Sequence, residues 1–226
     1  MTGFDWHPFI ISSRAAIIAT FVTFFCGIAV ARWMAKYKGR LKNVLDGVFI
    51  APLVLPPTVV GFILLLIFGK NGPVGSLLLK LGATVIFSWP ATVIAASVVA
   101  FPIMYQSAKG AFEQVDSDLE NTARTLGASE WTVFWCITVP LVWPGLAAGA
   151  ILTFARALGE FGATLMLAGN IPGKTQTVPI AIYYAVDAGN RPLALLYMLI
   201  IMGISLSMLV VLNYWKKHQN RFRIAR

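Results

Sequence analysis

The chain has 226 residues, of which 58% are hydrophobic and only 12% are charged, about half the charged fraction of an ordinary soluble domain. With a mean hydropathy of +0.76, this composition excludes a soluble enzyme and a disordered chain, and it predicts an all-α protein that spans a lipid bilayer. The net charge of +9 is then evidence about the side of the membrane on which the cations lie, and no nucleic-acid partner is expected.

Apolar stretches with few charges recur along the chain, each near the roughly 20 residues that cross a bilayer core. They predict one transmembrane domain over residues 1–226 with five spans, at residues 10–31, 47–68, 82–106, 144–168 and 192–215. Pro52, Pro56 and Pro57 interrupt the second span and predict a broken helix there. A sixth span is the alternative, but the remaining apolar segment, residues 175–186, is short, and we expect a loop or an interfacial helix.

The Lys and Arg residues between the spans predict the orientation. With the amino terminus outside, the cytoplasmic segments hold five cations in residues 32–42, two in residues 105–142 and five in the carboxyl-terminal tail. The outside segments then hold five. Because Lys and Arg are enriched in cytoplasmic loops, we expect the amino terminus outside and the carboxyl terminus in the cytoplasm.

The predicted cytoplasmic loop, residues 113–140, holds five of the nine acidic residues. Ser117 and Glu120 have the spacing of a capping box at a helix start. Gly127 suits a left-handed helix stop, and Ser129 can cap a second short helix. The pattern therefore predicts a helix, a glycine break and a second helix, each with an apolar side. Such a loop either lies on lipid headgroups or enters a groove of a cytoplasmic partner.

The stretch LENTARTLGASEWTVFWCITVP, residues 119–140, resembles the coupling-loop signature of ABC importer permeases of the type I fold. That signature runs Glu-Ala-Ala, three residues, Gly, nine residues, Ile, one residue, Leu-Pro. The spacing matches throughout, while Asn, Thr and Val replace Glu, Ala and Leu at three positions. The role of the missing glutamate does not transfer, and Glu120 is its candidate substitute. The candidate coupling residues are Glu120, Asn121, Thr122, Ala123, Gly127, Ile137 and Pro140.

The resemblance implies that this loop docks into a separate ATPase subunit and transmits its motion to the membrane helices. It also implies a homodimer of this chain, a cytoplasmic dimer of ABC ATPases and an extracytoplasmic oxyanion-binding protein, in the plasma membrane of a bacterium or archaeon. The chain is then a transport subunit and not an enzyme. We expect it to bind no metal and no cofactor, because the partner ATPase uses the ATP and Mg. The segment GNIPGKT, residues 169–175, has three residues between its glycines where a phosphate loop needs four.

Residues 51–62 and 154–183 resemble the permeases that import molybdate, with the sulfate and tungstate permeases close behind. We therefore expect molybdate as the substrate and keep sulfate and tungstate as alternatives.

Three residues near the spans are candidates for the substrate pathway. Arg156 and Glu160 are four apart and can pair on one helix face. The pair either fixes helix packing alone or gives an anion pathway positive potential. Thr58 follows two prolines and offers a hydroxyl where the helix breaks, with ordinary packing as its alternative. A secondary anion transporter is the main rival class, and a membrane-embedded enzyme is a third; ATP-dependent transport with a co-purifying ATPase discriminates between them.

Overall fold

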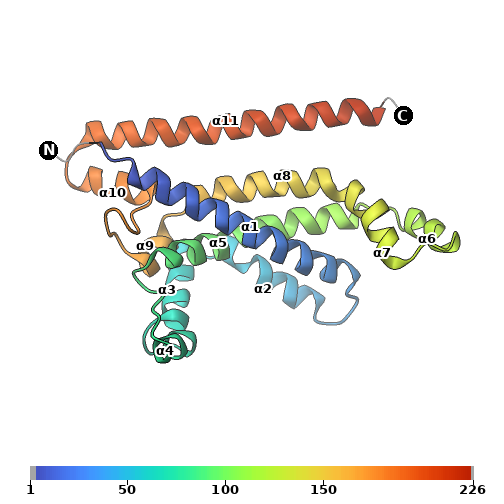
Figure 1. The fold of residues 1–226 in the computed structure, drawn as a ribbon, viewed down its shortest axis with the longest axis horizontal. Coiled ribbons are helices and arrows are strands. Elements are labelled where there is room, and N and C mark those ends of the chain that lie inside the picture. The colour runs from blue at the N-terminus through green and yellow to red at the C-terminus, as the bar shows by residue number, and fades with distance from the viewer. Residues whose placement is uncertain (1–3, 225–226) are drawn as a thin grey trace.

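The computed structural model describes residues 4–224, and within this range every regular element is a helix (Figure 1). The all-α prediction is therefore confirmed. The elements, in chain order, are α1 (His7–Lys36), α2 (Lys42–Val54), α3 (Pro57–Phe68), α4 (Pro73–Lys80), α5 (Trp89–Glu113), α6 (Ser117–Thr125), α7 (Glu130–Val133), the π-helix η1 (Phe134–Thr138), α8 (Val139–Leu158), α9 (Gly162–Ala168), α10 (Val178–Asp187) and α11 (Arg191–Ile224).

The described part of the chain has four helical segments that are long and apolar enough to cross a membrane: α1, α5, Glu130–Leu158 and Arg191–Val211. The pair α2 and α3 is a fifth candidate only if its two helices count as one span, because they meet at an angle of 111°. Leu55 and Pro56 are extended at this bend, and Pro57 has no N–H with which to continue the helix. The broken second helix was thus predicted correctly.

The fourth predicted span, residues 144–168, differs most from the structure. The helix starts upstream of residue 144 and ends at Leu158, and the separate helix α9 follows. The break lies at Gly159 and Phe161, whose backbones are not helical. Pro140 follows the π-helix η1, and Pro144 lies inside α8, so the helical segment accommodates both prolines.

The other helix ends also shift from their expected places. α5 starts at Trp89 and not at residue 82, since Gly82 and Phe87 have positive φ angles, and it continues to Glu113. The short apolar segment near residues 175–186 forms α10, a helix of 10 residues. This agrees with the expectation that it is too short to be a sixth span.

The centre of the bundle is made by α1, α5 and α8, which pack on one another. Their contact is lined by small buried side chains, including Ala16, Ala19, Ala96, Ala100 and Ala157. Small residues let membrane helices approach closely. α11 packs on α10 and α8 along one edge of the bundle (Figure 1), and most of its large apolar side chains up to Tyr214 are exposed.

The ends of several elements gather at one end of the molecule. Figure 1 shows the carboxyl-terminal end of α1, the start of α2, helices α6 and α7, and the carboxyl-terminal end of α11 together at this end. Helices α9 and α10 lie toward the opposite end. The fold therefore separates the predicted coupling loop from the charged pair near α9.

Candidate functional site

The first helix of the loop, α6, begins differently from the prediction. Asp116 is its N-cap, because the Asp116 carboxylate accepts a hydrogen bond of 2.9 Å from the Asp118 backbone N–H. Ser117 is the first helical residue, so the capping box predicted from Ser117 and Glu120 is wrong. Aspartate caps helices as well as serine does, and the two neighbouring candidates cannot be distinguished by residue type alone. Glu120 is thereby free for other contacts.

The glycine break and the second helix follow the predicted pattern. Gly127 has a φ angle of +86°, in the left-handed region, and it separates α6 from α7. The Ser129 hydroxyl accepts a hydrogen bond from the Thr132 backbone N–H at 3.2 Å, as expected of a cap. The chain then passes through η1 directly into α8. The second half of the loop, from Glu130, and the fourth span are therefore one continuous helical segment.

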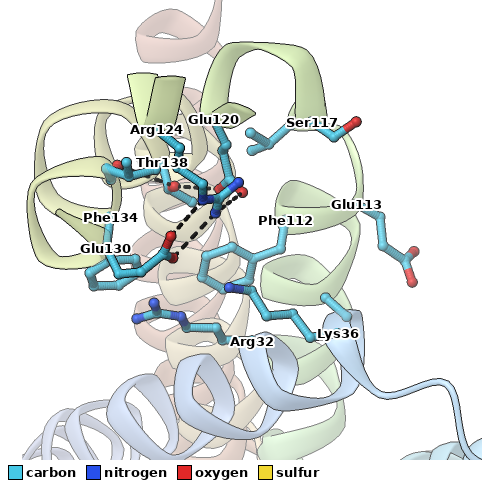
Figure 2. Close-up of a pocket in the computed structure, with 13 residues that line it drawn as sticks. Arg32, Lys36, Phe112, Glu113, Ser117, Glu120, Arg124, Glu130, Phe134 and Thr138 are labelled. Carbon is cyan, nitrogen blue, oxygen red and sulfur yellow. Dashed lines mark hydrogen bonds and ion pairs between the residues drawn. The ribbon is translucent and has the colours of Figure 1, made fainter. Parts of the chain in front are cut away.

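Arg124 holds the two halves of the loop together (Figure 2). Its guanidinium donates to Glu130 at 2.5 Å through Nε and at 3.2 Å through Nη2. It also donates to Glu120 Oε2 at 3.2 Å and to Asn121 Oδ1 at 2.9 Å. Asn121 occupies the position of the glutamate in the resembled signature. In this chain its side chain binds within the loop.

Glu120 ties α6 to the start of the fourth span. The hydroxyl of Thr138, a buried residue in η1, donates to Glu120 Oε1 at 2.7 Å. This hydrogen bond lowers the pKa of Glu120 most, and Arg124 lowers it further against the opposing effect of burial. Glu120 therefore points back toward the membrane helices as a carboxylate that accepts two bonds within the protein.

A pocket of about 150 Å³ separates the loop from the end of α1. Arg32 on α1 lies with its guanidinium carbon 3.5 Å from the centre of the Phe134 ring, a cation–π contact. Figure 2 shows Arg32 below Phe134 and Lys36 one turn further along α1, facing the same pocket. The sequence did not predict a role at this site for Arg32, Phe134 or Thr138. The one signal was the pair of cations four residues apart at the end of α1, which we used for orientation alone.

The outer side of the loop is apolar and exposed. Leu126 is 83% exposed and Trp131 is 72% exposed, and Leu119 and Trp135 are also exposed. Among the other predicted coupling residues, Asn121, Thr122 and Pro140 are exposed, while Ala123 and Ile137 are half-buried. The loop thus exposes several large apolar side chains, while Glu120 and Arg124 are half-buried and Asp116, Asp118 and Glu130 are exposed.

The candidate pathway residues Arg156 and Glu160 pair as predicted. Arg156 Nη1 lies 2.9 Å from Glu160 Oε2, and the side chains are 29% and 2% exposed. Glu160 lies after the end of α8, and its Oε1 accepts a hydrogen bond of 2.8 Å from the Ala163 N–H in the first turn of α9. The carboxylate therefore joins the two helices across their break, a role that the sequence did not indicate.

Thr58 lies near this break, in the exposed first turn of α3. α3 packs against α9, and a Cβ added at Gly162 would lie 3.4 Å from the Thr58 backbone N. Gly162 is two residues beyond Glu160. The structure thus brings the three pathway candidates to the same region, where α3, α8 and α9 meet.

Curated proteins with similar sequences are named as molybdenum transport permeases. A candidate molybdenum transport system permease protein of Bacillus subtilis is 50% identical over 212 residues, 93% of each chain. The molybdenum transport system permease protein of Escherichia coli K12 is 40% identical over 230 residues, which cover 100% of this chain and 99% of that protein. A probable sulfate transport system permease protein of Chlorokybus atmophyticus is 30% identical over 91% of this chain.

The chain is also similar to solved structures of ABC transporters, and most of its length matches one protein family. The methionine ABC transporter in inward-facing conformations matches with a TM-score of 0.73 at 14% identity, covering 93% of this chain and 94% of that chain. A bacterial ABC transporter involved in import of the polysaccharide alginate matches with a TM-score of 0.71 at 15% identity, covering 93% and 79%. These likenesses show the fold. Residues 24–221 match the family described as binding-protein-dependent transport system inner membrane components, and the chain belongs to this family of multi-pass membrane permeases.

Proposed function

We propose that this chain is the membrane subunit of an importer that carries molybdate into the cell, driven by a separate ATPase. The observation that carries the proposal is the loop between α5 and α8. Its exposed Leu126 and Trp131 form an apolar surface, while Arg124 and Glu120 bind it to η1 at the start of the fourth span. Such a surface fits a groove in a cytoplasmic partner, and the rigid attachment lets its movement reach α8.

The partners follow from the same proposal. ATP and Mg are bound by a dimer of ABC ATPases, which the loop contacts on the cytoplasmic side. An extracytoplasmic binding protein delivers the oxyanion. Two copies of this chain enclose the pathway, since four or five spans are few to surround a solute and homodimers are the commonest oligomers. The chain lies in the plasma membrane of a bacterium or archaeon, with the amino terminus outside and the carboxyl terminus in the cytoplasm.

Transport proceeds by alternating access in this proposal. Movement of the ATPases shifts both coupling loops, and the membrane helices swing between outward-open and inward-open arrangements of the dimer interface. Arg156 adds positive potential to the anion pathway, and Glu160 moderates it so that the anion can leave. Thr58 contributes a hydroxyl to the pathway in the same region, where α3 packs against α9.

Purification of the complex tests the proposal. The tagged chain is expressed with the proteins encoded beside it, and the partners are identified by mass spectrometry. We expect an ABC ATPase and, after reconstitution with the binding protein, uptake of radiolabelled molybdate that requires ATP. A Trp131→Ala variant should recover less ATPase, whereas Trp6→Ala, at an exposed tryptophan at the amino-terminal end of α1, should not. Recovery of the chain without an ATPase, or uptake without ATP, would favour a secondary anion transporter.

Competition identifies the substrate. Excess unlabelled molybdate, tungstate or sulfate is added to the same uptake assay. Molybdate should compete at the lowest concentration, and stronger competition by tungstate or sulfate would reassign the substrate within the same class of tetrahedral oxyanions.

A further inference from the structure

A polar residue, Gln106, is exposed on one face of α5, although α5 has the length and hydropathy of a membrane span. Gln106 and Gly110 are four residues apart and therefore lie on the same face of the helix, and Gln114 follows as its C-cap. Gln106 and Gln114 are exposed. A bilayer core of about 20 residues that begins at Trp89, the first residue of α5, includes Gln106 and ends before Lys109. An amide in contact with lipid tails has no hydrogen-bond partners, so this face requires another environment.

The exposed face of α5 lines a groove of about 470 Å³ that α8 closes on its other side. Ser107 and Gly110 line it from α5, and Pro144 and Gly145 line it from α8. The helices touch at small residues, because a Cβ added at Gly145 would lie 2.7 Å from the Cβ of Ala111. The walls are thus close together at this point, and the groove is lined by polar side chains as well as by apolar ones such as Leu141 and Val142.

The groove opens at the coupling loop. Asp116 and Leu119, at the start of α6, line this end. The Asp116 carboxylate is engaged in capping α6 through its bond to the Asp118 N–H. The groove therefore continues from the membrane-embedded part of α5 to the end of the molecule that we assign to the cytoplasm.

We propose that this groove is the cytoplasmic part of the oxyanion pathway and that Gln106 donates hydrogen bonds to the anion as it leaves. The inference rests on the proposed function and names residues of its pathway. Among the residues that line the groove in the described part of the chain, none is Lys or Arg. Uncharged amide and hydroxyl donors, from Gln106 and Ser107, bind an anion weakly enough to release it. Arg156 belongs to the separate charged region near α9.

Thiol accessibility tests whether water fills the groove. Gln106→Cys is made in a Cys136→Ser background, and the native Cys26 serves as the matched control. Cys26 is exposed on α1 and lines an apolar groove beside Val22 and Phe49. The complex with its ATPase, in lipid nanodiscs, is treated with a negatively charged methanethiosulfonate, without nucleotide and after trapping with ATP and vanadate.

We expect the thiol at position 106 to react at least about ten times faster than Cys26 in one of the two states, and millimolar molybdate to slow the reaction. Reaction as slow as that of Cys26 in both states would overturn the inference, because water would then not reach this face of α5. A spontaneous disulfide between two copies, together with slow reaction, would identify a protein contact instead.

Uptake tests the role of the amide. Gln106→Leu keeps the approximate size and removes the donor, so we expect uptake about fivefold slower, a loss on the scale of one hydrogen bond. ATPase activity stimulated by the binding protein should stay within about twofold. Gln106→Asn, which retains an amide, should restore most of the uptake, and Ser97→Ala, on α5 outside the groove, should change neither activity.

The two proposals fail in different ways. If the wild-type complex takes up oxyanion and Gln106→Leu does so equally fast, the role of Gln106 is wrong. If the wild-type complex takes up no oxyanion, the proposed function is wrong, and the thiol reaction still decides whether the groove holds water.

Discussion

Gly127 allows the loop to turn between α6 and α7 because of its backbone conformation. No heavy atom would lie within 4 Å of a Cβ added there, so the position has space for a side chain. Its φ angle of +86° is nevertheless unfavourable for a β-branched residue, by about 1–2 kcal/mol. We expect Gly127→Val to remove most ATP-dependent uptake while the protein still inserts into the membrane. Gly127→Asn is the control, since asparagine tolerates this region better, and full uptake by the valine variant would contradict the prediction.

Glu120 gives the loop a pH-dependent contribution to stability. Its pKa lies below the ordinary value of 4.5, first because of the hydrogen bond from Thr138 and then because of Arg124. A carboxyl whose pKa is lowered by folding stabilises the folded protein above pH 4.5 and loses this effect as the pH falls through the folded-state pKa. Glu120→Gln should therefore lower the free energy of unfolding by about 1 kcal/mol at pH 7. The difference from wild type should shrink below pH 4.5 in thermal unfolding, and a constant difference would contradict the argument.

At the scale of elements, Arg32 connects α1 to the coupling loop through the ring of Phe134. A cation–π contact of this kind contributes about 0.5–2 kcal/mol. We expect Arg32→Gln to speed hydrogen exchange of the backbone in residues 130–138. Arg40→Gln removes an equal charge from the exposed segment after α1 and should leave the exchange unchanged. Equal effects of the two variants would point to net charge and not to the contact.

The packing of α3 on α9 depends on Gly61. A Cβ at this position would lie 2.8 Å from the Ala163 Cα and 2.8 Å from the Met166 Cβ, so the backbone of α9 would have to move. Overpacking of this kind costs about 1–3 kcal/mol. We expect Gly61→Ala to lower the unfolding temperature of the purified protein by several degrees. Gly47→Ala, on α2 with no atom within 4 Å of the added Cβ, should lower it little or raise it.

Most elements have the type that the sequence predicted, but several of them begin or end at residues other than the predicted ones. Apolar length predicted five spans, and the structure has four long apolar helices, with a fifth only if the bent pair α2 and α3 counts as one span. Proline predicted the bend at Pro57. The break after α8 was missed because Gly159 alone is a weak signal and the stabilising contact, from Glu160 to the Ala163 N–H, is visible only in the structure. The inward contacts of Glu120 and Arg124 were missed for the same reason, since their partners lie up to 18 residues away.

At the scale of the whole molecule, the orientation follows from the ends that the fold brings together. The end of α1, the coupling loop and the carboxyl-terminal end of α11 gather at one end (Figure 1). The twelve cations that we assign to the cytoplasm lie from the end of α1 to the start of α2, near the end of α5, in the coupling loop, and at the end of α11 with the tail after it. Because Lys and Arg remain on the cytoplasmic side during insertion, all of these segments should face the cytoplasm. We expect a fluorescent protein fused after Arg226 to fluoresce in cells, because it matures in the cytoplasm and not after export across the membrane.

An alkaline phosphatase fused at the same place should be inactive for the opposite reason, and a cysteine placed in the outer segment at Lys174 should react with an impermeant reagent in intact cells. Lys174 is exposed in the turn before α10, so burial does not prevent the reaction. If a cysteine at Lys38 is labelled in intact cells and a phosphatase fused after Arg226 is active, the orientation is the reverse of the one we propose. The coupling loop would then lie outside, where no ATP is supplied, and the proposed contact with a cytoplasmic ATPase would fail with it.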